Sequence, residues 1–382
     1  MDTHPDIPHG ELPFSLRERI VTFTLLLVMA FGAWQAIAAW RNPESMEGVP
    51  LGWHDFTDGR TTHKLEKQMD QHLPAREGLI GFANSLRYLL LRGGGNDVVV
   101  GRDGWLFLTE EIRYDPPKQQ PERTRVELLA SARKALQAQG VNLLVALVPD
   151  KARMYSEWMP LGRYPAYNEL RYANAVAGLR ARGVPVADLR SALAEAGGDD
   201  TTYYRTDTHW NQRGAAVAAS AIARIVLADG PCEPPTSYVT TQGKPVERPG
   251  DLIRMMGLEH VPNAFRPRPD REAPASTVEQ PGGGDAGLGL FGDNSVPVVL
   301  TGTSFSMRGN FSGALQQALS CKVLNSAQDG GGFLTATTQY LKDDAFRTSK
   351  PKWLVWEVPE RFLTQPLTDE ARWLHEVGLD QP

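Results

Sequence analysis

Apolar residues follow two alternating patterns through most of the chain. Segments such as 124–139 repeat apolar residues at helical spacing and end on a glycine, here Gly140. Segments such as 142–149 are short continuous apolar runs, typical of strands buried on both faces. The predicted helices cover residues 76–92, 124–139, 168–182, 212–228 and 312–319, and the predicted strands cover 142–149, 184–189, 296–301, 322–324 and 353–358. This alternation predicts an α/β fold in which helices flank a parallel sheet.

Residues 20–40 form the longest apolar run, and it contains no charged side chain. A helix of that length spans about 30 Å, which matches the hydrocarbon core of a bilayer. Arg17 and Arg19 precede the run and only Arg41 follows it closely. The positive-inside rule therefore predicts a transmembrane signal-anchor helix, with residues 1–19 as a cytoplasmic tail and the rest of the chain across the membrane. Cleavage as a signal peptide and burial as a core helix are the alternatives.

The same pattern divides the rest of the chain. Residues 41–75 are expected to be a linker with a short helical approach, and residues 76–365 a single α/β domain. Within that domain, residues 98–108 predict two short strands around an Asp-Gly turn. Residues 229–295 are rich in Pro and Gly and are too long for an idle connection, which predicts a functional lid or a mobile insertion. Residues 366–382 are expected to be a C-terminal tail.

Charge and cysteine content exclude several functions. The net charge of −5 argues against a nucleic-acid partner on electrostatic grounds, and none is expected. Two cysteines, Cys232 and Cys321, cannot form a disulfide framework or a cysteine-rich metal site. Outside the cytoplasm these two could oxidise to a disulfide, although the sequence does not show whether they meet.

The densest polar cluster is YYRTDTHWNQRG, residues 203–214. Asp207 and His209 are two positions apart, so on an extended segment their side chains point to the same side. A carboxylate beside an imidazole holds one tautomer and stabilises the protonated ring, as a general base requires. A predicted helix begins directly after the cluster.

A second cluster, GTSFS, follows the predicted strand at 296–301. A small Gly-x-Ser turn at the C-terminal end of a buried parallel strand is where α/β enzymes place reactive groups. Ser304 would lie on this turn, close to backbone N–H groups that can bind an oxyanion. The motif is not the complete nucleophile elbow, because Ser306 stands in place of the second glycine.

Two other interpretations of these residues stay open at this point. Asp207 can cap the following helix, His209 can be a buried structural histidine, and Ser304 can be an ordinary turn residue. Asp207 and His209 can also be two ligands of a metal ion. The other histidines supply no companion at metal-ligand spacing, so no metal site is expected.

The motifs together resemble those of the AlgJ/AlgX-type alginate O-acetyltransferases, a family with an SGNH-hydrolase-like fold. The resemblance rests on DTHW at 207–210 followed by GTSFS at 302–306, with VVVGRDGWLFL at 98–108, VPDKARMY at 148–155 and WEVPERF at 356–362 in the family's order. It implies a permuted SGNH-like acetyltransferase domain in which Asp and His precede Ser. Four further residues also match family motifs: Lys151, Tyr155, Glu357 and Arg361. No role can be argued for them, apart from an ion pair between Glu357 and Arg361.

Carried over to this sequence, the resemblance makes Ser304 the nucleophile, His209 the general base and Asp207 its orienting carboxylate. Asn310 and Gly331, in the Gly330–Gly332 run, are weaker candidates for oxyanion or substrate contacts. Trp210 is a further substrate candidate, with packing in the core as the favoured alternative.

The implied activity is O-acetylation of exopolysaccharide hydroxyls, of alginate or cellulose type, by a membrane-anchored periplasmic enzyme that needs no cofactor. Its implied partners are the polysaccharide acceptor, the inner membrane, and a polytopic membrane O-acyltransferase that supplies acetyl groups. An acetyl esterase with the same triad and a non-catalytic scaffold or polysaccharide-binding subunit are the alternative functions.

Overall fold

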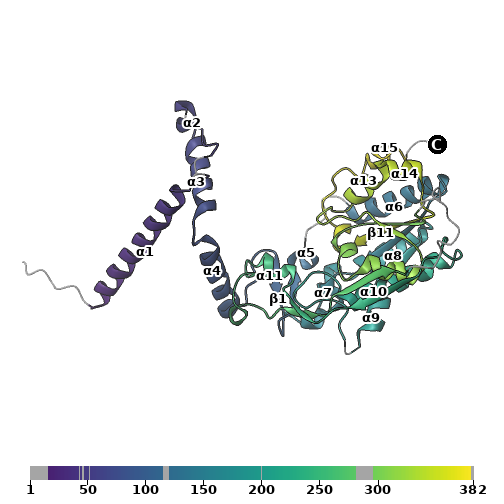
Figure 1. Ribbon diagram of the computed structural model, residues 1–382, viewed down its shortest axis with the longest axis horizontal. Helices are drawn as coiled ribbons and strands as arrows, with labels where there is room; N and C mark the ends of the chain where they lie inside the picture. The colour runs from purple at the N-terminus through teal and green to yellow at the C-terminus, as the bar shows by residue number, and fades with distance from the viewer. Residues whose placement is uncertain are drawn as a thin grey trace, which may run out of the picture. The chain divides into compact units, whose positions relative to one another are not determined.

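The computed structural model describes residues 16–42, 44, 47–50, 52–114, 120–198, 200–280 and 296–379. The chain divides into two compact units, residues 1–83 and 84–382 (Figure 1). The first unit contains α1 (Leu16–Trp40), α2 (Trp53–Thr57), α3 (Arg60–His72) and the first half of α4 (Arg76–Leu91). The segment expected to be a linker is therefore largely helical.

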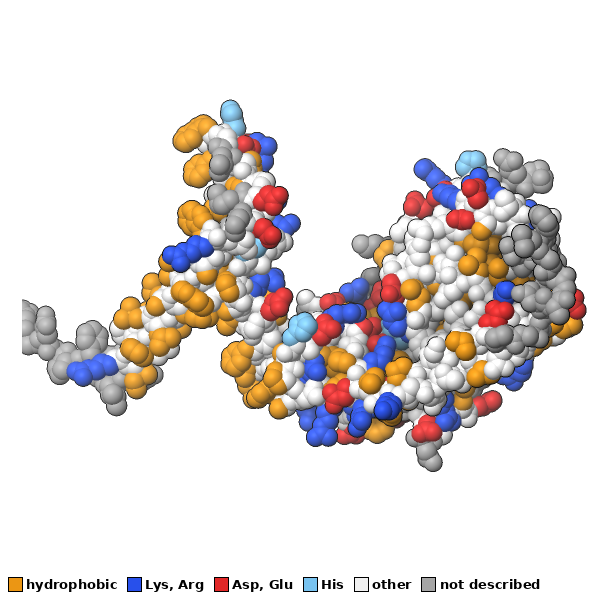
Figure 2. Space-filling view, viewed as in Figure 1, with side chains coloured by type: hydrophobic (Ala, Val, Ile, Leu, Met, Phe, Trp, Pro, Cys, Tyr) orange, Lys and Arg blue, Asp and Glu red, His pale blue; other side chains and the backbone are white. Residues whose placement is uncertain are grey.

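Helix α1 is long and apolar enough to cross a membrane over Arg19–Trp40, 22 residues near the N-terminus. Its apolar side chains are exposed and run along the helix (Figure 2). An exposed apolar helix of this length has the character of a membrane anchor or of a signal sequence. Most of the predicted cytoplasmic tail, residues 1–15, lies outside the described residues.

The second unit is built on a five-stranded sheet in the order β10-β9-β11-β3-β4, and all of its strand pairs are parallel. The strands are β3 (Asn142–Val148), β4 (Val186–Asp188), β9 (Val298–Thr301), β10 (Val323–Asn325) and β11 (Trp353–Pro359). The central pair is in register from Trp353 opposite Asn142 to Pro359 opposite Val148. The predicted α/β fold is confirmed, with each strand within a residue or two of its expected position.

Helices cover both faces of this sheet, which explains the continuous apolar runs. In β3, Leu144 and Ala146 pack into the core on one face, while Leu143 and Val145 pack into the core on the other. The first face is covered by α9 (Leu189–Gly197), α10 (Gln212–Leu227) and α12 (Phe311–Leu319). The second is covered by α6 (Pro121–Ala138), α8 (Arg171–Ala181), α13 (Thr335–Lys342), α14 (Asp344–Thr348) and α15 (Trp373–Glu376) (Figure 1).

A hairpin of β1 (Val98–Val100) and β2 (Leu106–Leu108) precedes the sheet, and it confirms the predicted turn. Asp103 and Gly104 both have positive φ, as a tight turn at an Asp-Gly pair requires. Short helices α5 (Thr109–Ile112) and α7 (Lys151–Met154) follow β2 and β3.

The described part of the predicted insertion, residues 229–280, contains regular secondary structure. Its strands form two antiparallel pairs, β5 (Tyr238–Gln242) with β8 (Ala275–Glu279) and β6 (Val246–Arg248) with β7 (Asp270–Glu272). Helix α11 (Asp251–Met255) follows β6, and its Leu252 and Ile253 are buried. The remainder of the predicted insertion, 281–295, lies outside the described residues.

The expectation of a C-terminal tail outside the domain is wrong for residues 366–379. Trp373 is buried against Trp356, and the Glu370 carboxylate accepts a 2.6 Å hydrogen bond from buried Arg125. The sequence pattern missed this packing because a single short helix gives too few residues for a periodic signal. Residues 380–382 lie outside the described residues.

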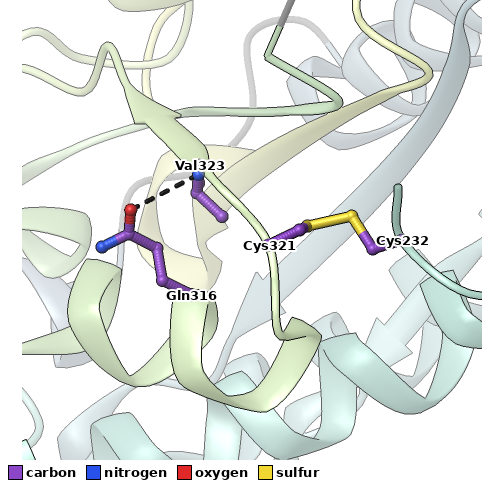
Figure 3. Close-up of a disulfide and its surroundings, with 4 residues drawn as sticks. All are labelled: Cys232, Gln316, Cys321 and Val323. Atoms are coloured by element: carbon purple, nitrogen blue, oxygen red, sulfur yellow. Dashed lines mark hydrogen bonds between the residues drawn. A yellow bond between two sulfur atoms is a disulfide. The ribbon is translucent and has the colours of Figure 1, made fainter. Parts of the chain in front are cut away.

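Cys232 and Cys321 form a disulfide, with their Cα atoms 5.9 Å apart (Figure 3). Cys321 lies between α12 and β10, and Cys232 lies just after α10. The bond joins positions 89 residues apart in the chain and ties the start of the 229–280 segment to the sheet. A buried disulfide suits an oxidising compartment.

Candidate functional site

Asp207 and His209 lie on the loop between α9 and α10, and the two side chains meet as the sequence predicts. His209 Nδ1 lies 2.6 Å from Asp207 Oδ1, and the backbone N–H of His209 donates to the same oxygen at 3.0 Å. A β-bridge between Tyr203 and Trp210 closes the loop, and residues 205–209 between them form bends rather than the extended segment that was expected. Asp207 is 3% exposed and His209 is 5% exposed, so water competes little for their hydrogen bonds.

Ser304 begins a single 3₁₀ turn, Ser304–Met307, immediately after β9. Its Oγ lies 2.7 Å from His209 Nε2, which completes a continuous chain from carboxylate to imidazole to hydroxyl. The edge of a parallel sheet at the C-terminal ends of its strands thus holds Ser304, as predicted. The backbone N–H of Ser304 has no hydrogen-bond acceptor among the described residues and is free to bind an oxyanion.

Glu357 on β11 holds the start of the Ser304–Met307 turn by hydrogen bonds. Its carboxylate accepts hydrogen bonds from the Thr303 backbone N–H at 2.7 Å and from the Ser306 hydroxyl at 3.1 Å. Burial raises the pKa of Glu357, although these hydrogen bonds oppose the shift. A Cβ at Gly302 would lie 2.5 Å from Glu357 Oε2 and 2.9 Å from its backbone oxygen, so only glycine fits there. Glu357 makes these hydrogen bonds instead of the expected ion pair with Arg361.

Arg248 and Lys151 hold the Asp207 segment from two further sides. The Arg248 guanidinium donates to Asp207 Oδ2 at 3.0 Å. Lys151 is fully buried and its Nζ donates to the backbone carbonyls of Leu106, Arg205 and Asp207 at 2.6–2.9 Å. Burial lowers the pKa of Lys151 to about 8, against the pull of surrounding carboxylates.

These contacts keep the Asp207 carboxylate ionised. Burial by itself raises the pKa of Asp207, but the hydrogen bond and charge of His209, together with the charge of Arg248, outweigh burial. The pKa of Asp207 is therefore held well below its ordinary value. A permanently ionised carboxylate on Nδ1 stabilises the imidazolium that forms when Nε2 takes a proton.

The Ser304 hydroxyl and the His209 imidazole line a cavity of about 380 Å³. Charged side chains of both signs make up much of the remaining wall. They are Arg248, Asp251, Arg254, Glu259, Arg308 and Asp329. The cavity can admit a small acyl group together with part of a polar acceptor.

Asp207, His209 and Asp251 offer ligand atoms within 4.8 Å of one another, the spacing that a metal ion would need. The Arg248 guanidinium already lies 3.0 Å from Asp207 Oδ2, and a cation there opposes the entry of a second one. His209 Nδ1 and Asp207 Oδ1 are also committed to each other at 2.6 Å. These residues fit an acid–base pair better than a metal site.

The weaker candidates from the sequence do not reach the cavity. Trp210 is 0% exposed and packs between Phe305 and Phe311, so stacking on a sugar is wrong and core packing is right. The Asn310 side-chain amide donates to Thr277 Oγ1 at 2.8 Å. The Gly331 backbone N–H points to the Gln328 carbonyl. Neither Asn310 nor Gly331 is among the described residues that line the cavity.

Sequence reasoning missed Arg248 and Asp251, which contact the Asp207–His209 pair from the 229–280 segment. The pattern around them, ERPGD, is an ordinary polar turn, and only the pairing of β6 with β7 brings it to the site. No local signal in the sequence marks these two residues as functional.

Comparisons with known proteins agree with this architecture. The family model described as "SGNH hydrolase-like domain, acetyltransferase AlgX" matches residues 98–360. The chain is 33% identical to a probable alginate O-acetylase AlgJ of Pseudomonas putida, over 88% of this chain and 87% of that protein. It is 34% identical to the Pseudomonas aeruginosa AlgJ protein of the same description, over 88% of each chain.

Solved structures give the same result. The O-acetyltransferase domain of Pseudomonas putida AlgJ matches with a TM-score of 0.64 and 33% identity, covering 74% of this chain and 99% of that one. Pseudomonas aeruginosa AlgX matches in fold, with a TM-score of 0.57 and 22% identity over 74% of this chain and 66% of that one. The chain therefore belongs to the AlgJ/AlgX family of SGNH-hydrolase-like acetyltransferases.

Proposed function

We propose that this protein is a polysaccharide O-acetyltransferase that transfers an acetyl group through an acetyl-Ser304 intermediate. The observation that carries the proposal is the unbroken chain from Asp207 Oδ1 to His209 Nδ1 and from His209 Nε2 to Ser304 Oγ. Relatives named as probable alginate O-acetylases support the acetyl group as cargo and a sugar hydroxyl as acceptor.

In the first half-reaction, Ser304 Oγ attacks the acetyl carbonyl carbon while His209 Nε2 takes the hydroxyl proton. The new oxyanion faces the free backbone N–H of Ser304. When the tetrahedral intermediate collapses, the donor's leaving group departs with the proton from Nε2. Asp207 keeps the imidazole in the required tautomer throughout.

The second half-reaction reverses these roles with a sugar as acceptor. A sugar hydroxyl gives its proton to His209 Nε2 and attacks the acetyl-serine carbonyl carbon. The bond from Ser304 Oγ to the acetyl carbon breaks, and Ser304 recovers its proton from Nε2. The product is a sugar acetyl ester, and the enzyme returns to its starting state.

The acceptor that fits this proposal is an exopolysaccharide of alginate or cellulose type. Acetyl groups reach the site from a polytopic membrane O-acyltransferase, the partner that the family resemblance implies. The cavity wall mixes Arg248, Arg254 and Arg308 with four carboxylates, Asp207 included, so it offers hydrogen bonds to sugar hydroxyls as well as charges. No cofactor takes part, because both half-reactions need only proton transfer and acyl transfer.

The test of this function is mass spectrometry after incubation with an activated acetyl ester. We expect an acetyl adduct on the peptide that contains Ser304, and its loss when an oligosaccharide acceptor is added. Ser306→Ala is the matched control, because it removes a hydroxyl two residues away that is turned toward Glu357. An adduct that survives Ser304→Ala would contradict the proposal.

We also propose that α1 stays attached and anchors the catalytic unit on the periplasmic side of the inner membrane. Arg17 and Arg19 before the apolar span and the Cys232–Cys321 disulfide both support this topology. A reporter that is active only outside the cytoplasm should therefore be active when fused after Pro382. Activity of a cytoplasm-only reporter at the same position would contradict it.

A further inference from the structure

Arg248 is fixed in place by more than its bond to Asp207. Its guanidinium lies over the Tyr204 ring at 4.1 Å from the ring centroid, and its Nε lies 3.9 Å from Glu272 Oε2. Glu272 belongs to β7, the strand that pairs with β6. The β6–β7 pair thus holds a positive charge in a fixed position beside Asp207 Oδ2, the carboxylate oxygen that is not bonded to His209.

Asp251 approaches the same pair from the first residue of α11. Its backbone N–H donates to Asp207 Oδ2 at 3.2 Å, and its carboxylate accepts from the Thr208 N–H at 2.8 Å and the Thr208 hydroxyl at 2.5 Å. The same carboxylate lies 3.5 Å from His209 Nδ1. Asp251 therefore adds a second negative charge on the Nδ1 side of the imidazole.

We propose that Arg248 and Asp251 are positioning residues of opposite effect, which together set the pH at which the Asp207–His209 pair becomes an active base. The inference rests on the triad of the proposed function. The 229–280 segment therefore takes part in the chemistry, because β6 places the Arg248 guanidinium and α11 places the Asp251 carboxylate beside the pair.

The direction of each effect follows from electrostatics. A positive charge near the pair disfavours the imidazolium, so removing it with Arg248→Gln makes the ring hold its proton to higher pH. The acid limb of the rate profile should then move up. A negative charge 3.5 Å from Nδ1 favours the imidazolium, so Asp251→Asn should move the acid limb down. Each shift should be about 1 pH unit, in line with a single charge within about 6 Å.

Other charges near His209 are common to both variants and do not produce the difference. They come from the elements around the pair and from the cavity wall: Asp207, Lys151, Arg254, Glu259, Asp270, Glu272, Arg308, Asp329, Glu357 and Arg361. Because they stay in place, the comparison of Arg248→Gln with Asp251→Asn isolates the two charges in question.

The experiment measures acetyl-Ser304 formation against pH in the full-length protein in detergent, with 4-nitrophenyl acetate as the acetyl donor. We expect the acid-limb midpoint to rise in Arg248→Gln, to fall in Asp251→Asn, and to return toward wild type in Arg248→Lys. Arg213→Gln is the matched control, because Arg213 forms an exposed pair with Asp200 away from the cavity. Midpoints that both stay fixed, or that move in the same direction, overturn the inference.

A second readout separates this inference from the proposed function. Diethyl pyrocarbonate modifies neutral imidazole, so the pH dependence of its addition to the His209 peptide reports ring protonation without any acetyl transfer. In a Ser304→Ala background the two substitutions should still move this midpoint in opposite directions. Opposite shifts without acetyl transfer in the parent protein would overturn the proposed function alone. Unchanged midpoints in this background overturn the inference even where transfer is normal.

Discussion

Ser304→Ala should abolish acetyl-enzyme formation and lower the rate of acetyl transfer by at least about 10⁴-fold. In the proposed mechanism the Ser304 Oγ that it removes forms the new bond, and this atom lies 2.7 Å from His209 Nε2, the proposed base. His209→Ala should cost nearly as much, because without Nε2 neither half-reaction has a proton acceptor. The measurement is the initial rate of acetyl transfer from an activated ester to an oligosaccharide, for each variant at one pH.

The double variant Ser304→Ala/His209→Ala decides whether these residues act as a unit. We expect it to be scarcely slower than either single variant, because once one member is lost the others have nothing to activate. Asp207→Asn should lose less than the other two, since the amide keeps the shape of the side chain but not its charge. Losses that multiply in the double variant would show that Ser304 and His209 work independently. Near-UV circular dichroism checks that each variant is folded.

The sheet could be predicted because each of its strands is buried on both faces. Continuous apolar runs such as β3 and β9 are unmistakable when helices cover both sides, and the parallel order follows from the helices between them. Short pieces such as α15 could not be predicted. A single helical turn is held by the core that it packs on, here by Trp373 against Trp356, rather than by its own pattern.

The candidate site divides in the same way. Asp207 and His209 are two residues apart, and Ser304 follows a predicted strand. The local sequence pattern is therefore enough to predict these three residues as candidates. Arg248 and Asp251 lie about 40 residues beyond Asp207 and reach it only through the pairing of β6 with β7. Trp210 is a different case: its place in a polar motif made it a substrate candidate, but core packing was the favoured alternative, and long-range packing buries the side chain completely.

Away from the cavity, the domain contains a buried cluster of charges around Glu360. The Glu360 carboxylate accepts hydrogen bonds from Arg153 at 2.6 and 2.9 Å, from Arg171 at 3.1 Å and from the Asp150 backbone N–H at 3.1 Å. Burial lowers the pKa of Arg153, but the hydrogen bond and charge of Glu360 outweigh it and raise that pKa overall. Burial and the charge of Glu360 also raise the pKa of neighbouring Asp150 well above its ordinary value.

Glu360→Ala should lower the free energy of unfolding by about 3–5 kcal/mol, the cost of leaving buried charges without their partner. The variant leaves Arg153, 2% exposed, without its buried carboxylate partner, and it leaves Arg171, 5% exposed, with Asp150 alone, next to an empty volume. A loss of that size is a large part of the 5–15 kcal/mol that typically stabilises a domain. The measurement is urea unfolding of the full-length protein in detergent, followed by near-UV circular dichroism.

Two further variants test why Glu360 stabilises the domain. One separates the charge of its side chain from the volume, and the other separates the effect of burial from that of forming an ion pair. Glu360→Gln keeps the size of the side chain and removes its charge, so we expect it to be nearly as destabilising as Glu360→Ala. Glu127→Ala breaks a pair of the same chemistry, because Glu127 accepts from Arg123 at 2.9 Å, but both groups are exposed and water replaces the lost contact. We expect that variant to unfold at the urea concentration of the parent. If Glu360→Gln matched the parent as well, the cluster would owe its stability to packing, and its charges would contribute nothing.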